Sequence, residues 1–322
     1  MEPQHGDRRA ARTHTSLGCA AVRRGARGSR GGAVSAGGRH VLVTGGTGFV
    51  GRHVVTGLLK AGYRVTVVSR DRSKAASIPG GAALNVLEAD PFAGDFRFPD
   101  SPGAMFVHLA WPHLDDYRNP AHFTEALPAS RRLVQAAVAA GVNQVTVAGT
   151  CLEYGMLSGE IAIDQPCLPI SAYGLGKLQL LQQLELLLGA SGTVTLQWVR
   201  LFYLHGPGQP PRTLMGQLEA AIARGDACFP MSLGEQLRDY LDIRAAAGDF
   251  VDIVRSGRPG LHHVCSGRPI SVRRLVEMRI RSAGVGMDLE LGRYPLPAHE
   301  PLAFWGKRSL PEPTVDFAEG QP

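Results

Sequence analysis

The chain has 322 residues, a length sufficient for one large α/β domain or two smaller ones. Hydrophobic residues make up 44% of it, as in globular proteins. Its net charge of +6 comes from residues 1–39, where eight arginines stand against two acidic residues, so the neutral remainder gives no argument for nucleic-acid binding. No apolar run approaches the roughly 18 residues of a membrane helix, and the five cysteines lack metal-ligand spacing, so we expect a cytoplasmic protein with reduced thiols and no metal.

Residues 1–38 are rich in arginine, glycine, alanine and serine and have few large apolar side chains. Such a segment cannot bury enough surface to fold, so we expect a disordered tail. Its Arg-rich, acid-poor composition is typical of a transit peptide. The pair Arg8-Arg9 is typical of a twin-arginine signal, but no apolar segment follows it, which excludes a secretory signal. A start codon assigned too early is the other alternative. Residues 311–322 should form a second, polar tail.

A glycine-rich stretch follows the first predicted strand, Val41–Thr44. Glycines at 45, 48 and 51 would let the chain turn sharply, let a ligand approach the backbone and let the next helix lie close to the strand. The start of that helix offers N–H groups to a pyrophosphate, although an ordinary strand–helix turn could have the same glycines. The residues expected to contact a dinucleotide here are Gly45, Thr47, Gly48, Phe49, Val50 and Gly51.

The second predicted strand, 63–69, ends at the position where an acidic residue would bind the adenosine ribose of NAD. The sequence there is Ser69-Arg70-Asp71-Arg72. An arginine and a hydroxyl suit a ribose 2′-phosphate, so Arg70 favours NADP, while Asp71 leaves NAD open. Arg72 is as well explained by simple solvation on a loop.

Strands and helices alternate through the first half of the chain, which predicts a doubly wound parallel sheet of the Rossmann type. Leu109 ends a predicted strand, Asp90 and Ala110 each follow one, and all three are expected beside the cofactor. His108, inside a strand, is interpreted as a packed core histidine. The further strands are predicted at 84–89, 104–109 and 144–148, and the helices at 52–61, 122–140 and 175–188.

Three residues predict the chemistry. Thr150 follows the fifth strand, at the edge of the sheet where ligands bind. Tyr173 and Lys177 are four residues apart, so their side chains share one face of a helix. We expect the ammonium to lower the pKa of the phenol, which makes Tyr173 a general acid for a carbonyl oxygen that Thr150 also contacts.

Together with the glycines upstream, this set resembles the short-chain dehydrogenase/reductase superfamily in its extended, nucleotide-sugar-modifying branch, which includes epimerases and dehydratases. The resemblance covers residues 39–310. It implies an NAD(P)-dependent enzyme in which Lys177 also holds the nicotinamide ribose, and in which Tyr173 and Lys177 both contact the cofactor. It divides the chain into a cofactor-binding domain at 39–204 and a mainly substrate-binding region at 205–310, with a returning strand near 238–252.

Later segments extend the resemblance. Residues 199–207 are similar to the sixth-strand segment of the branch, with Tyr203 in place of an asparagine. Residues 238–243 are similar to a segment whose arginine grips the substrate diphosphate, which implies that Arg238 binds substrate with Thr150 and Tyr173. The adjacent pair His262-His263 could suggest a metal, but side chains of neighbouring strand residues point to opposite faces, which favours a structural role.

Residues 107–112, 149–156 and 300–306 resemble the group that reduces dTDP-4-keto-6-deoxyhexoses at carbon 4, and dTDP-6-deoxy-L-talose is the product we favour. Ala126 stands where that group has an asparagine, so a proton relay through that side chain is not expected. The alternatives are a dTDP-fucose-forming reductase, an epimerase, a dehydratase or a non-catalytic NAD(P)-binding protein. Cys151-Leu152 after Thr150 argues against the dehydratase, which uses an acid/base pair there.

The helix beginning at Tyr173 has leucines all round it, more apolar surface than one side of a sheet needs. With the helix at 123–140 it could form a four-helix interface in a homodimer, as in relatives of this branch. The alternative is that the C-terminal region covers the surplus leucines.

Overall fold

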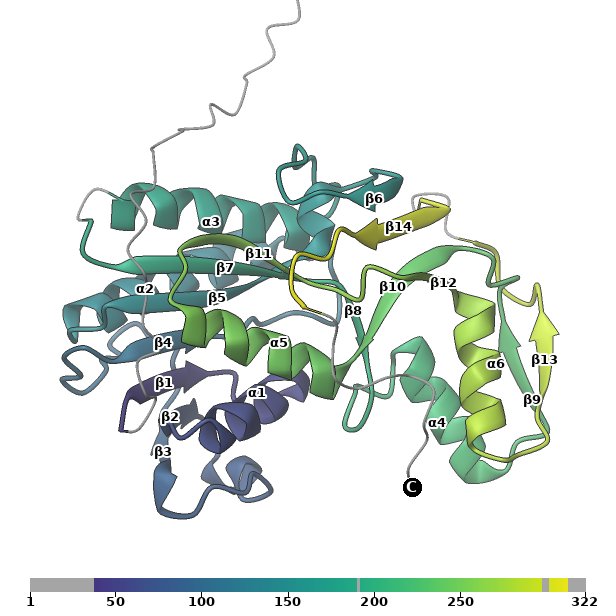
Figure 1. The fold of residues 1–322 in the computed structure, drawn as a ribbon, viewed down its shortest axis with the longest axis horizontal. Helices are drawn as coiled ribbons and strands as arrows, with labels where there is room; N and C mark the ends of the chain where they lie inside the picture. Colours follow the sequence, from purple (N-terminus) through teal and green to yellow (C-terminus); the bar gives the residue numbers. More distant parts are fainter. Residues whose placement is uncertain (1–37, 190–191, 297–300, 312–322) are drawn as a thin grey trace, which may run out of the picture. The chain divides into compact units, whose positions relative to one another are not determined.

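The computed structural model describes residues 38–189, 192–296 and 301–311, which all belong to the unit Ser35–Pro322. A seven-stranded parallel sheet has the order β11-β7-β5-β4-β1-β2-β3 (Figure 1). The expected doubly wound parallel sheet is therefore confirmed, and the predicted sixth-strand segment contributes to β7. The strands of the sheet are β1 (His40–Thr44), β2 (Arg64–Ser69), β3 (Leu84–Glu88), β4 (Met105–His108), β5 (Gln144–Thr150), β7 (Thr195–Leu201) and β11 (Gly260–Val264).

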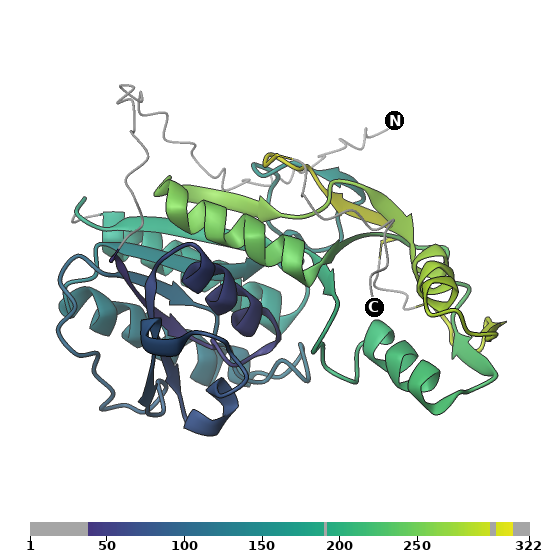
Figure 2. The ribbon, with the colours of Figure 1, turned by 60° about the horizontal axis from the view of Figure 1, so that its bottom comes forward.

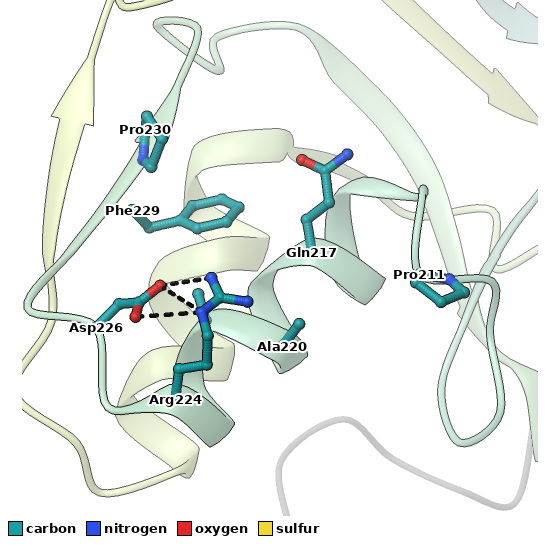
Figure 3. A pocket seen from close by; sticks show the side chains of 8 residues that line it. Pro211, Gln217, Ala220, Arg224, Asp226, Phe229 and Pro230 are labelled. Carbon is teal, nitrogen blue, oxygen red and sulfur yellow. Dashed lines mark hydrogen bonds and ion pairs between the residues drawn. The ribbon is translucent and has the colours of Figure 1, made fainter.

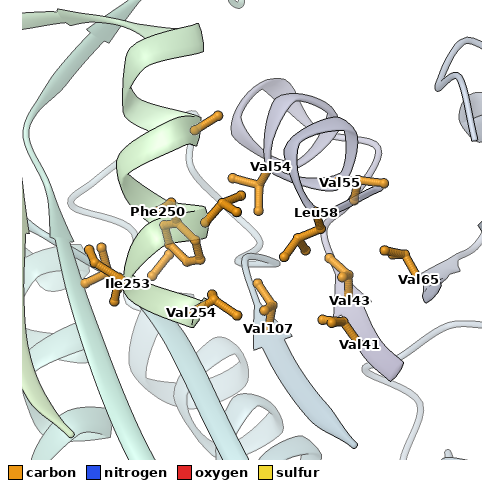
Figure 4. Packing of buried hydrophobic residues seen from close by; sticks show 14 of the residues in the cluster. Val41, Val43, Val54, Val55, Leu58, Val65, Val107, Phe250, Ile253 and Val254 are labelled. Atoms are coloured by element: carbon orange, nitrogen blue, oxygen red, sulfur yellow. The ribbon is translucent and has the colours of Figure 1, made fainter. Parts of the chain in front are cut away.

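Alternate side chains of the central strands enter two different cores, as the period of two in a strand requires. Val41 and Val43 face helices α1 (Phe49–Lys60) and α5 (Ile243–Ser256), which lie side by side on one face of the sheet (Figure 4). Leu42, between them, faces the opposite core with helices α2 (Leu127–Ala139) and α3 (Ala172–Gly189). Both faces of the parallel sheet are thus covered.

All three predicted helices differ from their predicted bounds, and α3 spans Ala172–Gly189 rather than 175–188. α1 begins at Phe49 rather than at 52, so Gly51 lies inside its first turn. The helix predicted over 122–140 is divided into a π-helical turn, His122–Ala126, and α2. Pro128 explains the irregular start, because it has no N–H to donate to a carbonyl four residues earlier.

The remaining strands form smaller sheets, and the remaining helices are α4 and α6 (Figure 2). One sheet has the order β12-β10-β14-β6, with β8 paired to β10, and β9 pairs with β13. α4 and α6 pack with β9 and β13 around a separate apolar core. Their bounds are β6 (Gly159–Ile161), β8 (Tyr203–His205), α4 (Leu214–Arg224), β9 (Cys228–Met231), β10 (Leu237–Asp242), β12 (Pro269–Ser271), α6 (Val272–Ser282), β13 (Asp288–Leu291) and β14 (Ala303–Gly306).

The division at residue 204 needs correction. The segment 238–252 does not add a strand to the main sheet, because β10 belongs to the smaller one. The elements that return are α5, which packs on the main core, and β11, which pairs with β7. The main sheet and its core therefore draw residues from both sides of the predicted boundary. The expected tails, 1–38 and 311–322, lie almost entirely outside the described residues.

The leucines of α3 divide into two sets. Leu180, Leu181, Leu184 and Leu188 are buried in the core of this chain, where they pack with α2 and Trp198. Leu186 is 79% exposed, and Leu175 and Leu187 are also exposed. The surplus apolar surface is thus smaller than the sequence indicated, because α3 contacts both the sheet and α2.

Candidate active site

The turn between β1 and α1 has the geometry that its glycines predicted. Gly45 has a φ of +74°, and a Cβ there would lie 2.5 Å from the nitrogen of Ala110. A Cβ on Gly51 would lie 2.0 Å from the carbonyl oxygen of Gly45, so only glycine allows α1 to approach the turn this closely. A Cβ on Gly48, in contrast, would meet only that same oxygen, at 3.3 Å.

The start of α1 fits the phosphates of a dinucleotide. Gly48 occupies the N-cap and has no side chain that could accept from the first N–H groups of the helix. The first turn of α1 contains no acidic residue either. The N–H groups that begin a helix otherwise need a partner, and an anion is a suitable one. Thr47, Phe49 and Val50 are in this turn, and Leu109 donates to the carbonyl of Thr44 beside it. These residues could hold the cofactor that the sequence predicts.

The end of β2 presents its charged residues differently. Arg70 is exposed, whereas Arg72 donates to the carbonyl of Val86 at 2.8 Å. The carboxylate of Asp71 accepts from the amide and the hydroxyl of Ser73, at 2.9 and 2.6 Å. Asp71 is thus used within its own loop, while the side chain of Arg70 is exposed. Asp90, after β3, is exposed and accepts from the amide of Phe92.

Thr150, Tyr173 and Lys177 come together beyond the end of β5. Thr150 is the last residue of that strand, and Tyr173 and Lys177 lie on the first turns of α3. The ammonium of Lys177 donates to the carbonyl of Ala148 at 2.7 Å, and a hydrogen bond between Thr150 and Tyr173 affects the pKa of the phenol. The three predicted residues therefore share one site.

The electrostatics of this site differ from the prediction in one respect. Burial raises the pKa of Tyr173, with smaller contributions from Tyr117 and Glu153 in the same direction. Burial lowers the pKa of Lys177 to about 7, against the opposing effect of Glu153. The expected lowering of the Tyr173 pKa by Lys177 is outweighed by burial, and the ammonium itself is directed at Ala148 and lies 4.1 Å from the centre of the Trp111 indole.

Aromatic rings surround Tyr173 on the side of the loop that follows β4. Tyr117 stacks on it with ring centres 5.0 Å apart, and Trp111 and His122 contact its edge and face. Trp111 donates to Nδ1 of His122 at 3.0 Å, which holds both rings in place. The amide of Tyr173 also donates to the carbonyl of Tyr117. Sequence reasoning missed Tyr117, which lies in a loop without periodicity, and His122, which begins the π-helical turn before α2.

A buried acidic residue beneath Thr150 was also missed. Glu153 is fully buried, accepts from the amide of Thr150 at 2.8 Å and forms an ion pair with Arg200 at 2.7 Å. The sequence did contain a signal for it, since Thr-Cys-Leu-Glu matches the pattern of a capping box, in which a Glu three residues after a Thr bonds back to the Thr amide.

The remaining predicted residues lie farther along the chain. Arg238 is 2% exposed and donates to the carbonyls of Leu237 and Pro301, with its guanidinium facing the ring of Tyr203. His263 is buried against Tyr154, 2.6 Å away, whereas His262 bonds to the carbonyl of Arg258, so the two histidines point apart as expected. His108 is fully buried and bonded to Thr44, which confirms its role in the core.

A hollow of about 310 Å³ lies between α4 and β9 (Figure 3). Its wall includes Phe229, Gln217 and the ion-paired side chains of Arg224 and Asp226. None of the predicted site residues lines it. Within the described part of the chain, no three His, Cys, Asp or Glu side chains are placed to hold a metal ion, and no helix has the length and apolarity to cross a membrane.

Comparison with known proteins gives one family and several relatives. The model of the NAD dependent epimerase/dehydratase family matches residues 41–262. A dTDP-6-deoxy-L-talose 4-dehydrogenase (NAD(+)) of Aggregatibacter actinomycetemcomitans is 27% identical over 84% of this chain and 100% of its own length. A dTDP-6-deoxy-L-talose 4-dehydrogenase (NAD(P)(+)) of Kitasatospora kifunensis is 29% identical over 77% of this chain and 80% of its own. The solved structure of MoeE5 in complex with UDP-glucose and NAD has 28% sequence identity with this chain and a TM-score of 0.69. The match covers 84% of this chain and 90% of the MoeE5 chain.

Proposed function

The chain belongs to the NAD dependent epimerase/dehydratase family, and within this family we propose that it is an NAD(P)H-dependent 4-ketoreductase of a dTDP-4-keto-6-deoxyhexose. The reaction is reversible, so the enzyme would act as a dTDP-6-deoxy-L-talose 4-dehydrogenase in the other direction. The two talose dehydrogenase relatives favour this product over the alternative, dTDP-fucose.

One observation supports this chemistry above the others: Thr150, Tyr173 and Lys177 share a site at the end of β5. Strand β5 is separated from β1 by β4 alone, so the site and the glycine turn lie along the same edge of the sheet. A nucleotide seated on the turn would extend toward Thr150. The arrangement suits hydride transfer between a nicotinamide and a sugar carbon.

The residues of the chain have separate roles in this reaction. A bound nicotinamide would supply the hydride. Tyr173 donates a proton to the oxygen on carbon 4, where negative charge develops as the hydride arrives. Thr150 accepts from the amide of Leu152 at 3.2 Å, so its own proton can be donated to the same sugar oxygen. Lys177 would hold the nicotinamide ribose with donors other than the one directed at Ala148.

We infer a preference for NADP, with NAD as the alternative. Arg70 is exposed at the end of β2, where a ribose 2′-phosphate would lie, and Asp71 is engaged by Ser73. The turn residues Gly45 to Gly51 would bind the pyrophosphate, and Asp90, Leu109 and Ala110 would flank the nucleotide. Arg238 would bind the substrate diphosphate, although its guanidinium is now directed at backbone carbonyls.

We also propose a homodimer, with the cytoplasm as its location. The exposed leucines 175, 186 and 187 on α3 leave apolar side chains on the outer surface of the helix. An interface formed by α2 and α3 of two subunits would cover them.

The rival functions are an epimerase, a dehydratase and a non-catalytic NAD(P)-binding protein. Cys151 and Leu152 stand where a dehydratase would need an acid and a base, and burial raises the pKa of Cys151 to about 12, which makes it a poor proton donor or acceptor. An epimerase binds its NAD tightly and regenerates it in each cycle, so the assay would show no net change in the oxidation state of the cofactor.

The experiment is an assay of the purified protein with a panel of dTDP-4-keto-6-deoxyhexoses and, separately, UDP-hexoses, each with NADPH or NADH. We expect stoichiometric oxidation of the nicotinamide with the dTDP-4-keto sugars, and NMR of the product should show a 6-deoxyhexose with the configuration of talose at carbon 4. Interconversion of UDP-hexoses without net oxidation would indicate the epimerase. Cofactor binding without turnover of any sugar would indicate the non-catalytic protein.

A further inference from the structure

Glu153 is a fully buried acidic residue that the mechanism above does not use. A buried carboxylate is costly unless both of its oxygens are bonded to donors. Its position, three residues after Thr150 in the turn Cys151–Tyr154, therefore calls for a physical reason.

The carboxylate connects the end of β5 to the neighbouring strand β7. Its Oε1 accepts from the amide of Thr150 at 2.8 Å and from the indole of Trp198 at 3.0 Å. Its Oε2 accepts from the guanidinium of Arg200 at 2.7 Å. A Cβ on Gly149 would lie 2.6 Å from Oε1 and 2.2 Å from the Trp198 nitrogen, so these groups press directly against the last residues of the strand.

These bonds fix the backbone of Thr150. Thr150 is extended, with φ −146° and ψ 147°, and its amide donates to Glu153. Its hydroxyl oxygen accepts from the amide of Leu152 in the same turn. The hydroxyl therefore has one acceptor site occupied, and it is also hydrogen-bonded to Tyr173, so its position beside the proposed reacting oxygen is set by this turn.

We propose that Glu153 is a positioning residue for the reduction: through the Thr150 amide it holds the Thr150 hydroxyl where the oxygen on carbon 4 accepts its proton. This inference rests on the proposed function. Trp198 and Arg200 support it by fixing the carboxylate against β7. The competing interpretation is that the carboxylate only stabilises the fold by satisfying buried donors.

The variant Glu153→Gln separates these interpretations. An amide has one acceptor oxygen and one NH₂ group, so it cannot accept at both positions, and its NH₂ group must face either the Thr150 amide or the Arg200 guanidinium. Displacement of the hydroxyl by about 1 Å should lower kcat by roughly 10², while KM for the dTDP sugar, which depends on other contacts, stays within about threefold of the wild-type value.

The same substitution in a Thr150→Ala background provides the second arm. If Glu153 acts through Thr150, the loss of the hydroxyl leaves nothing to position, and Glu153→Gln should then change kcat by less than about threefold. Loss of thermal stability should be equal in both backgrounds. An equal fall of kcat in the two backgrounds would overturn the proposal, as would an unchanged kcat in Glu153→Gln alone.

Tyr154→Phe is the matched control. The Tyr154 hydroxyl bonds to Arg200 at 2.7 Å and to His263 at 2.6 Å, on the far side of the guanidinium from Thr150. This variant should lower the melting temperature yet keep kcat within about threefold of wild type. If it lowers kcat as much as Glu153→Gln does, the effect belongs to the buried network as a whole and the positioning role is overturned.

Hydrogen exchange of the Thr150 amide tests the contact without turnover. In Glu153→Gln this amide should exchange at least about tenfold faster relative to that of Val147 in the same strand, because its bond to a charged acceptor is lost. Unchanged protection would overturn the proposal even if the enzyme reduces the sugar. Conversely, a wild-type protein that fails to reduce any 4-keto sugar but shows the exchange effect would refute only the proposed function. If Glu153→Gln does not fold, Trp198→Phe replaces it, because this variant removes one donor to the carboxylate. It should lower kcat and speed the exchange of the Thr150 amide in the same direction but by smaller factors.

Discussion

The ammonium of Lys177 donates to the carbonyl oxygen of Ala148 across 2.7 Å. Ala148 stands two residues before Thr150 on β5, so this bond attaches the first turns of α3 to the end of the strand. Lys177 is only 2% exposed and lies over the Trp111 indole. The relative positions of Thr150, Tyr173 and Lys177 are therefore set by the fold itself.

Lys177 should make stability depend on pH. Burial lowers its pKa to about 7 from an ordinary 10.5, so between these values the unfolded chain binds one more proton than the folded chain. The free energy of unfolding should then rise by about 1.4 kcal/mol per pH unit within this window and be lowest below pH 7. Lys177→Met should lack this slope. Urea unfolding of both proteins at several pH values between 6 and 10 measures it, and parallel curves would refute the buried, partly deprotonated lysine.

Gly51 and Gly48 should respond differently to alanine. The added methyl at 51 would collide with the carbonyl of Gly45, so Gly51→Ala should lower the free energy of unfolding by about 3 kcal/mol. At 48 the methyl would meet only that oxygen at 3.3 Å, so Gly48→Ala should fold normally and weaken cofactor binding, because it narrows the approach to the backbone. Denaturation and nicotinamide fluorescence titrations measure the two effects. Similar losses of stability in both variants would contradict this division of roles.

Arg70→Ala tests the preference for NADP. The variant should raise KM for NADPH at least about tenfold and leave KM for NADH nearly unchanged, because it removes a charge-assisted contact to the 2′-phosphate. Arg72→Ala is the control, since Arg72 is exposed on the same loop but its guanidinium donates to Val86. Equal changes for the two cofactors in Arg70→Ala would remove the argument for NADP.

The dimer can be tested at two leucines of α3. Leu187 is 38% exposed, so Leu187→Glu should yield a folded monomer in light scattering if α3 lies in the interface. Leu184 is fully buried within the chain, so Leu184→Glu should unfold the protein rather than dissociate a dimer. A wild-type protein that is monomeric at micromolar concentration would contradict the proposed assembly.

The features that sequence predicted best depend on short spacings. The order of strands and helices, the roles of Gly45 and Gly51, and the placement of Thr150 at a strand end all follow from residues close together in the chain. Tyr173 and Lys177 could be paired because a helical turn brings residues four apart onto one face. The parallel sheet then placed Thr150 near them, since ligand sites lie at the carboxyl ends of strands.

The features that sequence missed depend on contacts between distant segments. Glu153 and Arg200 are 47 residues apart, and no local pattern indicates that β7 would lie beside the turn after β5. The pKa of Tyr173 was predicted wrongly for the same reason, because burial beneath Tyr117 and Trp111 could not be seen from the pair Tyr173 and Lys177 alone. The exposed apolar surface of α3 was overestimated, because the sequence does not show how many of its leucines α2 covers in the packed structure.

The central claim is hydride transfer to carbon 4 with Tyr173 as the proton donor, and isotope transfer measures it most directly. NADPH with deuterium at carbon 4 of the nicotinamide should deliver one deuterium to carbon 4 of the hexose for each NADPH oxidised. Tyr173→Phe should keep cofactor binding and slow this transfer by about 10²–10⁴, the usual contribution of a general acid. Deuterium absent from carbon 4 of the product, or transfer in Tyr173→Phe within about threefold of the wild-type rate, would contradict the account.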